Sequence, residues 1–234
     1  MPGHQSGCSL SLYRTLGFTF RRRKPARWHV DTRMTSPASP QDLWRDVSLF
    51  EETQISANVT ADDAPRFFQQ HGVFYQAVPG MEEIKKRLGN AAQNITGLDM
   101  FKITDARLLK ILEPYTPTLW FVFGPTQGSF QSFTIAEEIE NEAIIYIWGK
   151  DTTFEFSYGS HVGELKGVST SYKLFHVPFV YLREKKKLQE VSVHMEQGGV
   201  MIAHPRLCVL VSSGYAIGYA CKRKPGGATT ITQT

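Results

Sequence analysis

The spacing of hydrophobic residues changes about halfway along the chain. In the first half, apolar residues recur at intervals of three and four, which is typical of amphipathic helices. After Pro117 the chain consists of short aromatic and β-branched runs separated by glycine, which is typical of strands. We therefore expect helices in the first half and a β-rich second half.

Residues that favour helix ends mark the expected helices. Ser39 is followed by proline, an arrangement that suits the first turn of a helix. Thr60 with Asp63 three residues later resembles a capping box, and Gly72 is suited to end that helix. These signals and the apolar spacing predict helices at 39–52, 60–72, 81–93 and 105–112.

The second half contains nine expected strands. In one of them Phe154, Phe156 and Tyr158 alternate with Glu155 and Ser157, so one face is buried and the other is solvated, as in an antiparallel sheet. Many short strands of this kind predict a sandwich or barrel within one domain, mainly β with N-terminal helices. The expected strands are 119–123, 129–135, 143–148, 153–158, 174–182, 188–196, 200–203, 207–212 and 215–221.

The charge of the chain is concentrated in its first residues. The net charge is +4, and seven basic residues lie within residues 1–33 against the single acid Asp31. We expect a disordered basic arm at 1–38, a domain at 39–224 and a disordered tail at 225–234. The domain itself is close to neutral, so we expect no nucleic-acid partner. The arm resembles a mitochondrial transit peptide and its RRRK run a nuclear signal, while Met34 is an alternative start of the protein.

Composition places the domain among soluble intracellular proteins. Hydrophobic residues make up 41% of the chain, which is enough for a packed core, and no run is long enough for a membrane helix. The three cysteines do not form a disulfide framework, which fits a reducing compartment. We expect a cytoplasmic protein, or a mitochondrial one if the arm is a transit peptide. The composition does not specify an oligomeric state.

Histidine and carboxylate residues are the candidate chemistry, because the sequence lacks the common phosphate-loop, serine-hydrolase and zinc motifs. His194 and Glu196 share one face of an expected strand, and His204 follows beyond a glycine turn. If the next strand pairs with the first, these three side chains form a two-histidine, one-carboxylate metal site. The alternative is that His194 and Glu196 lie on an ordinary solvated strand face. His29 and Asp31 have similar spacing but lie in the arm.

Several short motifs occur in an order that resembles a known family. Gly159-Ser160-His161 follows an aromatic strand, and Gly198-Gly199 precedes an apolar strand and the segment His204-Pro205-Arg206-Leu207. This order, over residues 42–221, resembles the phytanoyl-CoA dioxygenase-like branch of the Fe(II)/2-oxoglutarate oxygenases. The resemblance implies a double-stranded β-helix, or jelly roll, with Fe(II) and 2-oxoglutarate as cofactors if the protein is active.

The sequence also departs from that family at the iron site. The H-x-D motif of the family has no histidine to match it between Leu119 and Trp148, and Cys208 and Val209 stand where its distal histidine belongs. Arg206 is the candidate for the 2-oxoglutarate carboxylate, with Arg223 as an alternative. We therefore expect a divergent oxygenase-like protein that acts on or binds a small organic molecule, with His194, Glu196 and His204 as metal ligands. The alternatives are a catalytically inactive jelly-roll binding or interaction module and a metal-independent enzyme on the same fold.

Overall fold

The computed structural model describes residues 49–83, 86, 103–126, 128–139, 141–170 and 174–225. All of these residues belong to one compact unit, Ala38–Thr234. The predicted arm at 1–38, most of the predicted helix at 39–52 and the predicted tail after Pro225 lie outside the described residues. Among the described helices, none is long and apolar enough to cross a membrane.

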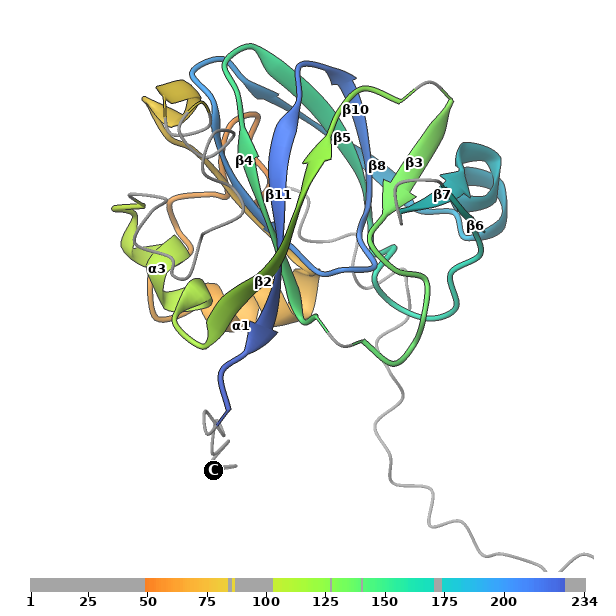
Figure 1. Ribbon diagram of the computed structural model, residues 1–234, viewed down its shortest axis with the longest axis horizontal. Coiled ribbons are helices and arrows are strands. Elements are labelled where there is room, and N and C mark those ends of the chain that lie inside the picture. Colours follow the sequence, from red (N-terminus) through yellow and green to blue (C-terminus); the bar gives the residue numbers. More distant parts are fainter. Residues whose placement is uncertain are drawn as a thin grey trace, which may run out of the picture. The chain divides into compact units, whose positions relative to one another are not determined.

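Two α-helices pack side by side below the sheets in Figure 1. The first, α1 (Ala64–His71), ends at Gly72 in a left-handed conformation, as predicted. Ahead of it the Thr60 hydroxyl accepts a hydrogen bond from the Asp63 N–H at 3.2 Å and donates one to the Asp63 carboxylate at 2.7 Å. The second helix, α3 (Ala106–Leu112), begins at Asp105, whose carboxylate accepts hydrogen bonds from the N–H groups of its first turn. Both helices confirm the sequence prediction.

Eleven strands are present among the described residues. In chain order they are β1 (Val73–Ala77), β2 (Tyr115–Phe123), β3 (Ser129–Ser132), β4 (Ala143–Trp148), β5 (Thr152–Tyr158), β6 (Val168–Ser169), β7 (Phe175–Pro178), β8 (Gln189–Met195), β9 (Gly199–Ala203), β10 (Cys208–Ser213) and β11 (Ala216–Arg223). Each of the nine predicted strands overlaps one of these.

The strands form two antiparallel sheets with the order of a jelly roll. One sheet has the order β1-β9-β4-β11-β2 and the other the order β6-β7-β3-β10-β5-β8. From β2 to β5, and again from β8 to β11, consecutive strands lie in opposite sheets. Four strands from each sheet therefore make a double-stranded β-helix, extended by β1 on one sheet and by β7 and β6 on the other. The predicted fold class is confirmed.

Aromatic side chains fill the space between the two sheets. The indole of Trp148 on β4 stacks on the ring of Phe154 on β5, with centroids 4.3 Å apart. Tyr75 on β1 packs edge-on against Phe156 on β5, and all four side chains are fully buried. Since these contacts join strands of opposite sheets, the two sheets share one hydrophobic core.

Two predicted boundaries were wrong. The predicted helix at 39–52 does not reach its expected end, because Phe50 forms a β-bridge with Ile55. The predicted strand at 174–182 ends at Pro178, and a one-turn π-helix, η4 (Tyr181–Lys185), follows it. Proline cannot donate to a sheet ladder, so the apolar run after it continues in helical form. Of the predicted helix at 81–93, Met81–Glu83 and Lys86 are helical, and its remaining residues lie outside the described part.

Candidate functional site: a buried basic cluster

The Gly-Ser-His segment follows β5 in the chain and is hydrogen-bonded to the beginning of β10. Ser160 is fully buried, and its hydroxyl accepts a hydrogen bond from the Cys208 N–H at 2.8 Å. The His161 ring packs on Gly72 so closely that a Cβ atom at Gly72 would lie 2.6 Å from the Cγ atom of the ring. This segment therefore has a structural role, because it fixes His161 between α1 and the turn before β10.

Three histidines from separate parts of the chain meet at this point. His71 lies on α1, and its Nδ1 atom is 2.6 Å from the Tyr158 hydroxyl. The rings of His161 and His204 have centroids 5.5 Å apart. The backbone N–H of His204 donates to the Gly72 carbonyl at 2.8 Å, and its Nδ1 atom accepts a hydrogen bond from the Arg206 N–H at 3.2 Å. These histidines are far apart in the sequence, and the jelly-roll fold brings them together.

Burial keeps two of these histidines neutral. Burial, together with the nearby His204, lowers the pKa of His161 to about 3. Burial, together with the Arg206 guanidinium, lowers the pKa of His204 to about 4. At neutral pH both rings therefore carry one proton each and act as hydrogen-bond donors and acceptors rather than as cations.

Arg206 brings a full positive charge into the cluster. Its side chain is 7% exposed, and its guanidinium donates to the Gly163 carbonyl oxygen. Lys186 lies beside it and donates to the carbonyls of Val162 and Glu164, at 2.9 and 2.8 Å. Burial, followed by the charge of Arg206, lowers the pKa of Lys186. Arg206, Lys186, His161 and His204 are called the basic cluster below.

Two buried nitrogens of the basic cluster have no hydrogen-bond partner in the part of the chain that the structure describes. They are Nε of Arg206 and Nδ1 of His161. Among the described residues no carboxylate forms an ion pair with Arg206. A buried cation without an anionic partner and a buried ring nitrogen without a hydrogen bond are both unfavourable, so these two atoms make the basic cluster a candidate binding site.

The predicted metal ligands do not come together. His194 lies on β8, where its Nδ1 atom is 2.9 Å from the Thr153 hydroxyl, and Glu196 follows the end of that strand. His204 follows the last residue of β9 (Gly199–Ala203), at the end of that strand away from Glu196. Five residues separate Gly199 from His204, which corresponds to about 16 Å along a strand. The described part of the chain contains no group of three histidine, cysteine or acidic side chains that could hold a metal ion.

The metal prediction assumed that the strands before and after Gly198-Gly199 pair as a hairpin. In the structure β8 pairs with β5, and β9 pairs with β4 and β1. The turn crosses from one sheet to the other. His29 and Asp31 lie outside the described residues.

The position expected for the iron ligands of the resembled family also lacks them. Val209 on β10 pairs with Gln131 on β3, and the described residues of β2, β3 and β4 include no histidine. Cys208 packs in the smaller cluster outside the barrel, and burial raises the pKa of its thiol to about 12. These side chains cannot bind Fe(II) as two histidines and a carboxylate do.

Sequence reasoning singled out Arg206 as a candidate for the 2-oxoglutarate carboxylate, but it did not anticipate the residues that surround Arg206 in the fold. His161 had a signal in the Gly-Ser-His motif, and Lys186 lies in the basic run Arg183–Lys187, whereas His71 had no signal. A feature that sequence reasoning could have used is the absence of acidic residues between Met201 and Lys224, which leaves Arg206 without a local partner.

Comparison with known proteins finds similar chains among solved structures alone. No family model matches the chain, and no curated protein matches it. Among solved structures, the epimerase SnoN, in complex with Fe3+, α-ketoglutarate and nogalamycin RO, is 13% identical with a TM-score of 0.43, over 70% of this chain and 83% of that chain. The α-ketoglutarate-dependent carbocyclase SnoK from nogalamycin biosynthesis is 12% identical with a TM-score of 0.44, over 74% and 88%.

A third similar structure is AviO1 from Streptomyces viridochromogenes, which is 13% identical with a TM-score of 0.43, over 73% of this chain and 98% of that chain. The topology and the site together define this chain as a jelly-roll protein with a buried basic cluster at one end of its barrel.

Proposed function

We propose that this protein binds a small organic acid at the basic cluster and does so without an iron centre. The observation that carries the proposal is that Nε of Arg206 and Nδ1 of His161 are both buried and both without a hydrogen-bond partner. A carboxylate that accepts a hydrogen bond from Arg206 supplies the missing anion.

The neutral state of His161 further restricts which organic acids fit the basic cluster. Nδ1 of a neutral imidazole without a proton is an acceptor, so it requires a donor such as a hydroxyl group. A hydroxy acid provides both functions, because its carboxylate accepts from Arg206 and its hydroxyl donates to His161. Lys186 adds positive potential around the same position, and the neutral His204 ring offers a further polar contact.

The described residues do not fit an oxygenase of the usual kind. Bound Fe(II) would supply oxygen activation in such an enzyme, but the described histidines and carboxylates do not form a ligand set for it. The proposed function is therefore that of a divergent member of the oxygenase-like jelly rolls that keeps acid binding and lacks the metal. The order of helices, strands and the Gly-Ser-His loop supports a relation to the phytanoyl-CoA dioxygenase-like branch.

Ligand-induced stabilisation of the purified full-length chain tests the proposal. We expect 2-hydroxyglutarate or lactate, at millimolar concentration, to raise the thermal midpoint of the wild type. Arg206→Gln removes the cation, and Arg206→Lys keeps the charge but loses the planar donor fork, so both should weaken binding at least about tenfold. Arg183→Gln is the matched control, because Arg183 is an exposed arginine of η4.

Three outcomes would contradict the proposal. One is that no organic acid of the panel stabilises the protein. Another is that Arg206→Gln binds the acids as well as the wild type does. The third is that the purified protein contains one tightly bound iron per chain, whose removal lowers the thermal midpoint.

A further inference from the structure

A cavity lies away from the basic cluster, between the two α-helices and the ends of two strands. It has a volume of about 610 Å³ and is lined by residues of α1, of the C-terminal half of α3, of the beginning of β2 and of the end of β11. None of its lining residues belongs to the basic cluster. Cavities of about 300–1,000 Å³ are typical of small-molecule sites.

The floor of this cavity is apolar and aromatic. Phe68 of α1, Ile111 of α3 and Tyr115 of β2 form it, and each is largely buried in the core with a small area at the surface of the cavity. Three prolines also line the cavity, and proline side chains offer no hydrogen-bonding groups. A ligand must therefore present an apolar body to this floor.

The charges around the cavity are mainly positive. Lys110, Arg223 and Lys224 line it, against the single acid Glu113. Arg223 pairs with Glu142 at 2.8 Å and lies over the Tyr115 ring, and Lys224 donates to the Glu113 carbonyl at 2.7 Å. These two cations hold the end of β11 in place. Lys110 is exposed and has no ion-pair or hydrogen-bond partner among the described residues, so its charge is available to a ligand.

We infer that this cavity binds an amphiphilic organic anion, with a ring or short hydrocarbon body against Phe68, Ile111 and Tyr115 and an acidic group toward Lys110. The apolar floor and the surrounding cations both contribute to binding. The floor removes the apolar surface of the ligand from water, and the cations select for a negatively charged ligand. The inference concerns a site separate from the proposed function and does not depend on it.

The fluorescent probe 8-anilino-1-naphthalenesulfonate, which combines aromatic rings with one sulfonate, tests the inference on the folded full-length chain. We expect saturable binding and displacement of the probe by phenyl phosphate. Inorganic phosphate lacks the ring and benzyl alcohol lacks the charge, so neither should displace it at the same concentration. Displacement by benzyl alcohol as strong as that by phenyl phosphate overturns the charge part of the inference.

Two substitutions localise the probe. Gln69→Trp places a large side chain in the cavity from the exposed side of α1, and Lys110→Glu reverses the available charge. Each should weaken binding about tenfold or more. Lys150→Glu, the same charge change at an exposed lysine between β4 and β5, should leave binding unchanged. Circular dichroism and the thermal midpoint verify that each variant is folded.

The outcome separates this inference from the proposed function. Unchanged probe binding in both Gln69→Trp and Lys110→Glu overturns the inference, whatever happens at Arg206. Loss of probe binding in Arg206→Gln places the probe at the basic cluster and also overturns it. Failure of organic acids to bind at Arg206 leaves the cavity result intact.

Discussion

Gly72 meets two requirements at a single residue. It ends α1 with φ of +69°, and it lies against the His161 ring, where a Cβ atom would lie 2.6 Å from the Cγ atom. We expect Gly72→Ala to lower the free energy of unfolding by about 2–4 kcal/mol, through backbone strain and the clash together. Urea denaturation measures this loss. Gly80→Ala is the control, because Gly80 has φ of +82° but nothing within 4 Å of its Cβ position. Equal losses in the two variants would mean that the contact with His161 is unimportant.

The low pKa of His161 makes the stability of the protein depend on pH. Burial and the nearby His204 hold this pKa at about 3, below the ordinary value of 6.5. As the pH falls below 6.5, the unfolded chain binds a proton that the folded chain does not bind, so stability falls until the folded histidine itself titrates. This residue alone should remove about 2 kcal/mol between pH 7 and pH 5.

Urea denaturation at several pH values measures that dependence. We expect His161→Gln to flatten the decline in stability between pH 7 and pH 5 relative to the wild type. His194→Gln is the comparison variant, because His194 lies on β8, away from the basic cluster. A slope that is the same in His161→Gln and the wild type would show that His161 does not titrate as its burial requires.

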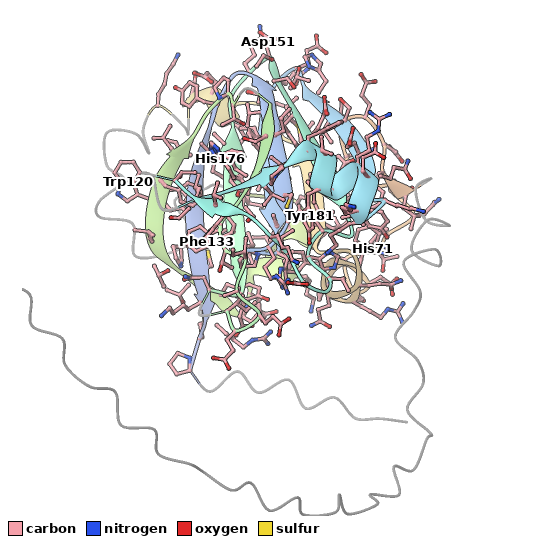
Figure 2. All side chains as sticks on the ribbon, turned by 90° about the vertical axis from the view of Figure 1, so that its right-hand side faces the viewer. His71, Trp120, Phe133, Asp151, His176 and Tyr181 are labelled. Carbon is pink, nitrogen blue, oxygen red and sulfur yellow. The ribbon has the colours of Figure 1, made fainter. Side chains whose placement is uncertain are left out.

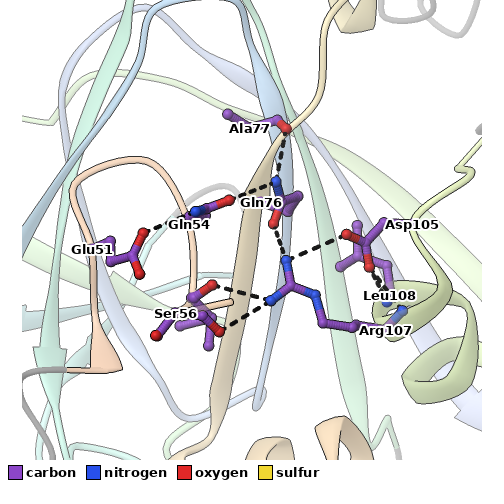
Figure 3. A network of polar contacts seen from close by, with 9 residues as sticks. Glu51, Gln54, Ser56, Gln76, Ala77, Asp105, Arg107 and Leu108 are labelled. Atoms are coloured by element: carbon purple, nitrogen blue, oxygen red, sulfur yellow. Dashed lines mark hydrogen bonds and ion pairs between the residues drawn. The ribbon is translucent and has the colours of Figure 1, made fainter. Parts of the chain in front are cut away.

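At the scale of elements, a network around Arg107 connects α3 to β1 and to the segment before α1 (Figure 3). The Arg107 guanidinium donates to the carbonyls of Ile55 and Ser56, both at 3.2 Å, and to the side chain of Gln76 on β1. It also pairs with Asp105 at 3.4 Å and lies over the Phe74 ring. One side chain thus satisfies backbone carbonyls of a segment that has little regular structure of its own.

Replacement of Arg107 should therefore destabilise the protein strongly. The side chain is 14% exposed, so Arg107→Gln leaves several largely buried acceptors without a donor, and we expect a loss of about 2–4 kcal/mol in the free energy of unfolding. Arg66→Gln is the matched control, because the Arg66 side chain is 79% exposed and pairs only with Asp63. That change should alter stability by less than about 1 kcal/mol. Comparable losses in the two variants would contradict a structural role for the Arg107 network.

The sequence predicted the positions of helices and strands better than the pairing of the strands into sheets, because the former depend on local patterns and the latter does not. The alternation in β5 is a local property, since Phe154 and Phe156 are fully buried and Glu155 between them is not, although the pattern ends at Ser157, which is also buried. β1 follows Gly72 directly with three consecutive buried residues, so it lacks that alternation and was missed. Pairing is not local: β8 and β9 are consecutive in sequence yet lie in different sheets. The metal prediction depended on that pairing, whereas the choice of Arg206 as a candidate depended on a charge that is visible in the sequence.

At the scale of the molecule, the basic cluster lies where distant segments meet. His71, labelled in Figure 2, comes from α1. His161 comes from the loop after β5, and His204 and Arg206 come from the turn between β9 and β10. Strands that run back and forth between the sheets bring every second loop to the same end of the barrel. Ser160 and the backbone of Gly72 then fix these loops to one another. A site of this kind depends on the intact jelly roll, because no single segment contains it.

The contact between Trp148 and Phe154 joins the two sheets and provides a test of their cooperation. The rings stack with centroids 4.3 Å apart, and both are fully buried. Phe154→Ala removes one side of this stack and leaves a cavity, so we expect a loss of about 3–5 kcal/mol in the free energy of unfolding. Val168→Ala, at a valine of β6 that is 66% exposed, should change stability by less than about 0.5 kcal/mol.

Because helices and both sheets share one core, unfolding should also be a single transition in the wild type. Tryptophan fluorescence includes the signal of Trp148 at the contact between the sheets, and far-ultraviolet circular dichroism reports on the backbone, so their urea midpoints should coincide. In Phe154→Ala both midpoints should move together to lower urea. A fluorescence transition that precedes the loss of circular dichroism would show that the sheets separate before they unfold, and that their shared core does not make the barrel one cooperative unit.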